Sequence, residues 1–469
     1  MEMIHEILTV VNDYWWSYIL IPLLVGCALW FSYKTKFVQF RLIGEMFKVL
    51  GGEDKDSISE KHKNHISSFQ AFSVSMATRV GTGNLAGVAT AIVVGGPGAI
   101  FWMWFMALIG SANSFIESTL AQAYKRKGED SFIGGPAYYM ERGLNKRWFG
   151  IIFAVLITIT FGFAFNSVQS NTICAAINQT FNVDATIMGP IITVMTLLLI
   201  FGGIHRIAKF SSVVVTFMAL AYIVLALFIV LMNITAFPSV IKLIVSSAMG
   251  MEQVAGGAIG AAVMQGVRRG LFSNEAGMGS SPNAAATANI SHPVKQGLIQ
   301  TLGVFVDTIF ICTCTAAIIL FSGLHIDGTS EGINLTQNAL TAEIGNLGGL
   351  FITIAVFLFA FTSILGNYYY GENNIRFITK NKTVMFIYRL CVGGMVLFGS
   401  MTTMQFAWDL SDLTMGLMAT CNLIALIFLG RQAVLLLNDY MAQRKAGIKN
   451  PVFKKKNIPE LSDKLDLWD

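Results

Sequence analysis

The stretch SSFQAFSVSMATRVGTGNLAGVATAIVV, at residues 67–94, decides the fold of this chain. It is apolar and long enough to cross the hydrocarbon core of a bilayer, which takes about 20 residues in a helix. Its middle holds helix-weakening and polar residues in close succession: Gly81, Thr82, Gly83, Asn84 and Gly87. Backbone groups left unpaired by such a break are tolerated inside a membrane only where they line a cavity or bind something. We therefore predict a broken helix that carries a binding site.

The composition of the whole chain also indicates a membrane protein. Of 469 residues, 54% are hydrophobic and 13% are charged, whereas about 25% are charged in an average soluble domain. The net charge is +5, but the basic residues are scattered among loops, so binding to nucleic acid is not expected. We predict an all-α polytopic protein of the lipid bilayer that needs no cofactor.

Eleven segments are long and apolar enough to span the bilayer. They lie at 15–33, 67–94, 98–124, 149–178, 187–203, 209–232, 239–266, 296–323, 346–369, 383–401 and 411–435. The first span and its loop, at 15–65, precede the other ten. The predicted transmembrane domain covers 1–435, and a basic cytoplasmic tail follows at 436–469.

Basic residues in short loops mark the cytoplasmic side and give the orientation. Of the 32 basic residues, all except Arg79, Lys242 and Arg389 fall in the loops after spans 1, 3, 5, 7 and 9 or in the C-terminal part of the chain from Arg431 onward. The opposite loops carry acidic residues such as Asp409 and Asp412. We therefore predict an outer N-terminus and a cytoplasmic C-terminus in the inner (plasma) membrane of a bacterium.

Span 7 repeats the glycine pattern of span 2. It places Gly256 and Gly257 in an apolar segment that follows Glu252 and Gln253. Spans 2–6, at 66–233, and spans 7–11, at 239–435, each cross the bilayer an odd number of times, so the two halves have opposite orientations. Paired broken helices in inverted halves are typical of transporters that bind their substrate at the midplane.

Polar residues inside the spans leave several interpretations open. Charged residues within the spans include Arg79, Glu117, Glu252, Asp307 and Arg389. Glu252 and Asp307 fit a pocket as well as they fit packing, and the other three fit helix ends or ion pairs. Thr362 and Ser363 either join helices by hydrogen bonds or give oxygen ligands to sodium. A channel would use the same broken helices, while a membrane enzyme is disfavoured because the chain has no HExxH motif.

Four motifs carry a family resemblance: GTGNLAGVATAIVVGGPGAIFWMW (81–104), GGPAYYM (134–140), RGLFSNEAGMGSSPNAAATA (269–288) and GNYYYGEN (366–373). They resemble those of the alanine or glycine:cation symporter family, the sodium:alanine symporters, and most closely its AlsT-like branch. The resemblance implies a LeuT-like fold, in which one extra helix precedes a 5+5 inverted repeat. It also implies alternating access driven by sodium, with a small neutral amino acid as substrate.

The resemblance further implies the residues of the site. The backbone amides of Thr82 and Gly83 would hold the substrate carboxylate, and Asn84 would lie between the substrate and a first sodium ion. A second sodium ion would have two carbonyl and two hydroxyl ligands, from Ala77, Val80, Thr362 and Ser363. Further pocket residues would come from spans 4, 7 and 9: Phe165, Gln169, Gly256, Gly257 and Asn367.

The substrate and the 269–288 stretch are less well specified by the sequence. The family favours alanine or glycine, whereas the polar residues Asn367, Glu252 and Gln253 favour glutamine. The stretch 269–288 is dense in glycine, asparagine and serine, which predicts turns. We expect it to lie on the cytoplasmic side, with a structural or inner-gate role.

Overall fold

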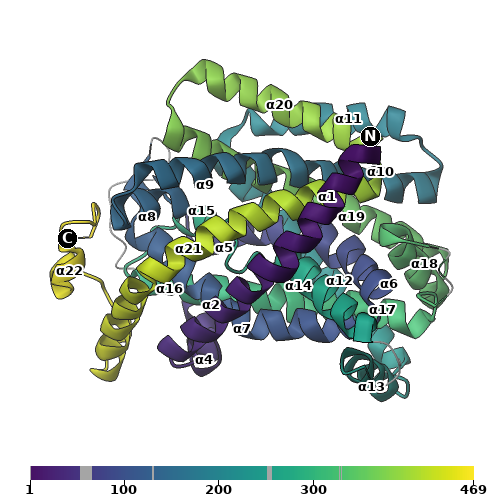
Figure 1. The fold of residues 1–469 in the computed structure, drawn as a ribbon, viewed down its shortest axis with the longest axis horizontal. Coiled ribbons are helices and arrows are strands. Elements are labelled where there is room, and N and C mark those ends of the chain that lie inside the picture. Colours follow the sequence, from purple (N-terminus) through teal and green to yellow (C-terminus); the bar gives the residue numbers. More distant parts are fainter. Residues whose placement is uncertain are drawn as a thin grey trace.

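The computed structural model describes residues 2–52, 66–128, 131–250, 256–326, 328 and 330–468. Helices make up most of it and pack around a large hydrophobic core (Figure 1). Within the described residues, the only sheet is a small antiparallel hairpin of β1 (Arg126–Lys127) and β2 (Phe132–Ile133). The prediction of an all-α architecture is confirmed in this sense.

The N-terminal helix lies across the bundle beside the last long helix, α21 (Met404–Lys445) (Figure 1). It is continuous through α1 (Glu2–Tyr14), η1 (Trp15–Leu20) and α2 (Ile21–Lys34). Trp16 is fully buried and donates from its indole N–H to the carbonyl of Asp412 at 3.2 Å. The short helices α3 (Val38–Arg41) and α4 (Ile43–Gly51) follow.

The first half of the bundle begins with α5 (Ser68–Arg79), where Ser67 and Gln70 form a capping box that satisfies free amides of the first turn. The chain continues through η2 (Gly83–Gly87), α6 (Val88–Gly95), α7 (Gly98–Ala123), α8 (Pro136–Gly143), α9 (Arg147–Ile159), η3 (Thr160–Phe165), α10 (Asn166–Phe181), α11 (Ala185–Ile200) and α12 (Gly203–Met232).

The second half packs against the first. Its elements are α13 (Phe237–Ala248), α14 (Gly256–Asn274), α15 (Pro282–Ala285), α16 (Pro293–Val304), η4 (Phe305–Cys312), α17 (Thr313–Ser322), α18 (Gly332–Ile344), α19 (Asn346–Ile378), α20 (Lys382–Met401) and α21. The helix α7 packs on α16, α10 on α19, and α11 on α20. Each of these pairs joins one helix of the first half to one of the second.

Eight of the described helices are long and apolar enough to cross a membrane. Three shorter apolar helices, Gly83–Gly95, Ala185–Ile200 and Phe237–Ala248, fall in the predicted spans 2, 5 and 7. The prediction of a multi-pass membrane protein is thereby supported, while the count of eleven spans stays a prediction.

The chain after α21 is not a separate tail. The helix α21 continues past the predicted boundary to Lys445, and the segment after it, with η5 (Lys455–Asn457) and α22 (Pro459–Ser462), folds back onto the bundle. The Trp468 side chain is buried and donates to the carbonyl of Ala123 at 3.1 Å. The Phe453 amide donates to the carbonyl of Ser291 at 2.9 Å. Apolar side chains in this segment explain the docking. The prediction of a tail relied on its basic residues and did not consider these apolar ones.

Candidate functional site

A first break in the helical backbone lies at residues 80–82, between α5 and η2. Val80 is extended, with φ −80° and ψ 91°, so the helix stops there. The Gly81 amide donates to Asn84 Oδ1 at 2.9 Å, and the Thr82 amide donates to Gln169 Oε1 at 3.1 Å. The amides of Gly81 and Thr82 are therefore satisfied by side chains, and not by helical carbonyls, as predicted for a broken helix at this position.

The side chain of Asn84 joins this break to a buried carboxylate. Its Nδ2 donates to Asp307 Oδ1 at 2.7 Å and to Ser273 Oγ at 3.1 Å. The second carboxylate oxygen of Asp307 accepts from Ser273 Oγ at 2.7 Å and from Thr308 Oγ1 at 2.9 Å. All four side chains are fully buried. We call Asn84, Ser273, Asp307 and Thr308 the Asn84 cluster, which places Asp307 in direct contact with the predicted site residue Asn84.

A second break lies at residues 275–281, between α14 and α15. Glu275, Gly277 and Gly279 have left-handed backbone conformations there, with φ of 58°, 89° and 87°. It is close to the first break, because a Cβ on Gly83 would lie 3.0 Å from Phe272 Cδ1 and 3.2 Å from Ser273 Cα. The 269–288 stretch is buried between helices and contains the turns that the sequence predicts, while its side of the membrane stays a prediction.

Gly256 and Gly257 begin the helix α14, directly after residues 251–255, which lie outside the described residues, so the interruption near these glycines stays a prediction. At a rise of 1.5 Å per residue, Gly256 lies about 24 Å along the helix from Phe272, and therefore away from the two breaks. Gly266 of α14 serves close packing, since a Cβ there would collide with the backbone of Ala99 in α7. Glu252 and Gln253 lie outside the described residues.

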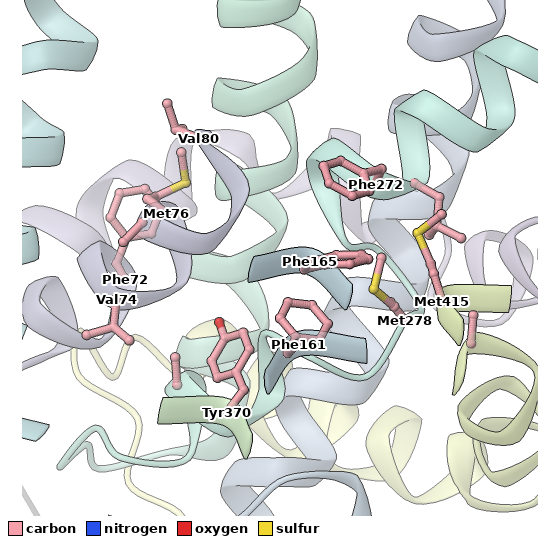
Figure 2. Packing of buried hydrophobic residues seen from close by; sticks show 14 of the residues in the cluster. Phe72, Val74, Met76, Val80, Phe161, Phe165, Phe272, Met278, Tyr370 and Met415 are labelled. Atoms are coloured by element: carbon pink, nitrogen blue, oxygen red, sulfur yellow. The ribbon is translucent and has the colours of Figure 1, made fainter. Parts of the chain in front are cut away.

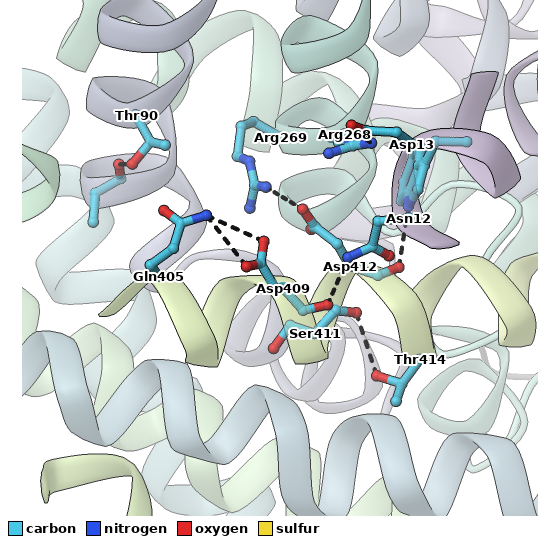
Figure 3. Close-up of polar contacts among 12 residues, drawn as sticks. Asn12, Asp13, Thr90, Arg268, Arg269, Gln405, Asp409, Ser411, Asp412 and Thr414 are labelled. Atoms are coloured by element: carbon cyan, nitrogen blue, oxygen red, sulfur yellow. Dashed lines mark hydrogen bonds and ion pairs between the residues drawn. The ribbon is translucent and has the colours of Figure 1, made fainter. Parts of the chain in front are cut away.

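Two arginines of α14 lie among acidic residues that the sequence places on the outer side (Figure 3). Arg268 bonds Asp13 at 2.8 Å, and Arg269 pairs with Asp412, both side chains of the second pair being buried. The sequence placed these arginines in a cytoplasmic loop, on the opposite side from Asp13 and Asp412. The structure instead brings the arginines and these two acidic residues together.

The predicted ligands of the second sodium ion are partly brought together. Ser363 Oγ donates to the carbonyl of Ala77 at 2.7 Å, which joins α19 to the last turns of α5. A Cβ on Gly81, next to Val80, would collide with Ser363 Oγ. The hydroxyl of Thr362 donates instead to Phe359, within its own helix, at 2.9 Å.

Aromatic side chains pack together next to Phe272, and Figure 2 shows Phe165 and Phe272 side by side. The rings of Phe165 and Phe272 have centroids 4.4 Å apart, and Phe272 lies 4.7 Å from Trp408. Arg269 stands over the Trp408 ring at 4.2 Å. These contacts connect Phe165, through Phe272, to Gly83 on one side and to Trp408 and Arg269 on the other.

Asn367 lies one helical turn after Ser363 on α19 and is fully buried. Its Nδ2 donates to Asn166 Oδ1 at 3.0 Å, while its Oδ1 accepts no hydrogen bond from the described residues. Asn166 in turn lies one turn before Gln169 on α10. The unsatisfied Oδ1 of Asn367 therefore lies in the part of the site where α19 meets α10, the helix that carries Gln169.

The sodium:alanine symporter family model matches residues 1–455. The chain belongs to the sodium:alanine symporter family. Among curated relatives of this family, a probable sodium/glutamine symporter, GlnT, of Bacillus subtilis (strain 168) is 53% identical over 97% of this chain and 94% of its own. The amino-acid carrier protein AlsT of the same organism is 50% identical over 99% of this chain and 98% of its own. The predicted family is thereby confirmed, and with it a sodium-coupled symporter as the class of protein.

A solved structure shares the fold of this symporter. A variant of the manganese transporter of Eremococcus coleocola superposes with a TM-score of 0.52 over 85% of each chain, at 13% sequence identity. This likeness shows that the helices are arranged as in a known membrane transporter.

Sequence reasoning missed the residues around the second break. Phe272 and Ser273 face Gly83, and Glu117 of α7 binds the break itself. The signal was present, because the glycine and serine density that marked the first break also occurs at 269–288. The search for a counterpart to the first break compared the glycine content of span 2 with that of later spans. It selected the apolar segment near Gly256 instead of the 269–288 stretch. For Arg389, the structure agrees with the ion-pair interpretation, since its Nη2 lies 3.3 Å from Glu372 Oε1.

Proposed function

We propose that this symporter imports a small neutral amino acid with sodium, by alternating access around the first and second breaks. The observation that carries the proposal is the Asn84 cluster, where a helix break, a carboxylate and two hydroxyls meet in a fully buried place. Free amides at the start of a helix suit a carboxylate ligand. The amides of Thr82 and Gly83 would bind the substrate carboxylate, whose oxygen replaces that of Gln169 on Thr82.

The first sodium ion would bind beside Asn84. Asp307 supplies a negative charge there, and Ser273 and Thr308 supply hydroxyl oxygens, the kind of ligand that a hard cation prefers. A fully buried carboxylate is costly unless a cation or several donors compensate it. Sodium at this place would compensate the charge of Asp307 next to the substrate site. Binding of sodium and binding of the substrate would then favour each other, which couples the transport of the two.

A second sodium ion would bind between α5 and α19, with ligands at Ala77, Val80, Thr362 and Ser363. The contact of Ser363 with the Ala77 carbonyl supports this site, because it brings two of the four groups within 2.7 Å. Phe165 and Gln169 would form the wall on the side of η3 and α10.

Alanine or glycine is the first candidate substrate, and one observation favours glutamine as a second. The free Oδ1 of buried Asn367 can accept a hydrogen bond from the carboxamide N–H₂ of a glutamine substrate. The relative named as a probable sodium/glutamine symporter supports the same choice.

The architecture that we propose has eleven spans, with one extra N-terminal helix and a LeuT-like 5+5 inverted repeat. Contacts between α7 and α16, α10 and α19, and α11 and α20 support it, since each joins corresponding spans of the two halves. We place the protein in a bacterial inner membrane with the N-terminus outside.

Uptake into proteoliposomes tests the proposal. Labelled alanine and glutamine are supplied under an inward sodium gradient, with potassium in place of sodium as control. We expect saturable, sodium-dependent uptake. We also expect unlabelled glutamine to inhibit the uptake of labelled alanine at a lower concentration than unlabelled alanine does. Failure of both substrates to accumulate would reject the symporter, and uptake that needs only a proton gradient would reject sodium as the coupling ion.

A further inference from the structure

The carboxylate of Glu117 binds the backbone of the second break. Glu117 lies in α7 and is fully buried. Its Oε1 accepts from the Gly277 amide at 3.1 Å, and its Oε2 accepts from the Gly279 amide at 3.0 Å and from Asn422 Nδ2 at 2.8 Å. A buried carboxylate in a membrane helix is usually compensated by a cation or lines a pathway. Here, two main-chain amides and a carboxamide are its hydrogen-bond donors.

The backbone at this place needs an acceptor of that kind. Gly277 and Gly279 have positive φ, so their amides leave the helical pattern and lose the carbonyl partners of a regular helix. Asn422 of α21 completes the arrangement, because its Nδ2 also donates to the Gly277 carbonyl at 2.9 Å and its Oδ1 accepts from the Tyr139 hydroxyl. Glu117 and Asn422 therefore fix both the amide and the carbonyl of Gly277.

The break that Glu117 holds is connected directly to the candidate site. Phe272 and Ser273 lie just before it on α14; Phe272 contacts Gly83, and Ser273 bonds both Asn84 and Asp307. A shift of the break moves these two residues relative to the first break. Since hydrogen bonds to a charged group are stronger than those between neutral groups, the carboxylate is a strong restraint on that shift.

We propose that Glu117 is a positioning residue for transport, which holds the second break so that Phe272 and Ser273 stay against the first. Its role in transport rests on the proposed function. Its hold on the break does not, and can be measured without any substrate.

The test uses Glu117→Gln in the full-length, purified protein. The variant keeps the size of the side chain, but it replaces one acceptor oxygen by an N–H₂ group that faces other donors. Hydrogen exchange followed by mass spectrometry reads the peptide around Gly277 and Gly279. We expect exchange there to accelerate at least about tenfold, because charge-assisted bonds to these amides are lost. Maximal sodium-driven uptake should fall by a similar factor, with unchanged yield and gel-filtration profile.

Thr119→Val is the matched control. Thr119 lies in the same helix and is equally buried, and its hydroxyl has no partner among the described residues. We expect exchange and uptake within about twofold of the unaltered protein. Unchanged exchange in Glu117→Gln, or equal acceleration in Thr119→Val, would overturn the inference. If the unaltered protein carries neither alanine nor glutamine, the proposed function fails, while the exchange result still decides whether Glu117 holds the break.

Discussion

The two breaks solve the same problem by different means. At the first break, neutral side chains satisfy the free amides, since Asn84 and Gln169 accept from Gly81 and Thr82. At the second break, a buried carboxylate, that of Glu117, accepts from two glycine amides. Replacing a neutral hydrogen-bond acceptor by a ligand atom costs little free energy, whereas breaking several charge-assisted hydrogen bonds costs more. The comparison teaches that the first break is suited to binding and the second to holding its shape.

Glycine also has a different purpose in each break. Gly277 and Gly279 adopt positive φ, which an L side chain rarely takes. Gly81 and Gly83 have no positive φ, but Ser363 and Phe272 press against the space where a Cβ would stand. The second break therefore requires glycine for conformation, and the first requires it for close contact.

Asn84→Ala should have the largest effect on transport. It removes the acceptor of the Gly81 amide and the donor to Asp307, so sodium-driven uptake should fall about 100-fold or more, at normal expression. Thr90→Val is the control on the same span, because Thr90 Oγ1 bonds only the carbonyl of Ala86 at 2.8 Å. Near-normal uptake in Asn84→Ala would exclude Asn84 from the site and remove the functional contrast between the two breaks.

Gly279→Ala should chiefly reduce stability. A Cβ there would lie 2.8 Å from Asn422 Cγ and 2.9 Å from Phe153 Cζ, in a left-handed conformation. We expect a loss of about 2 kcal/mol or more, seen as a lower thermal midpoint in detergent. Gly87→Ala, whose Cβ would stand 3.7 Å from Trp408, should change the midpoint little. Equal midpoints for the two variants would contradict a conformational need for glycine at the second break.

Ser363→Ala should have the smallest of these effects. It removes one hydroxyl from the Ala77 carbonyl, so the sodium concentration for half-maximal uptake should rise about tenfold. Thr362→Val should raise it only about twofold, because the Thr362 hydroxyl bonds within its own helix. Sodium-dependence curves of the two variants decide the matter. An unchanged curve for Ser363→Ala would return this pair to the role of joining helices.

Much of the first break could be predicted from local sequence. Three glycines and Asn84 in one apolar stretch identify it without any knowledge of neighbours. The second break carries an equally dense signal at 269–288, yet its polar residues were interpreted as a loop. Spans are identified by the mean hydropathy of a segment, and this criterion favoured the apolar start of α14. It missed a polar stretch that is buried because other helices cover it.

The sequence by itself determined the membrane class, the family and the position of the first break, because hydropathy, glycine content and motifs are properties of adjacent residues. Only the tertiary structure decided which side chains complete the site. Asp307 meets Asn84, Gln169 meets Thr82, Glu117 meets Gly277, and Trp468 docks on Ala123. These partners are far apart in the chain, and helix packing alone sets which of the many buried polar groups come within hydrogen-bonding distance.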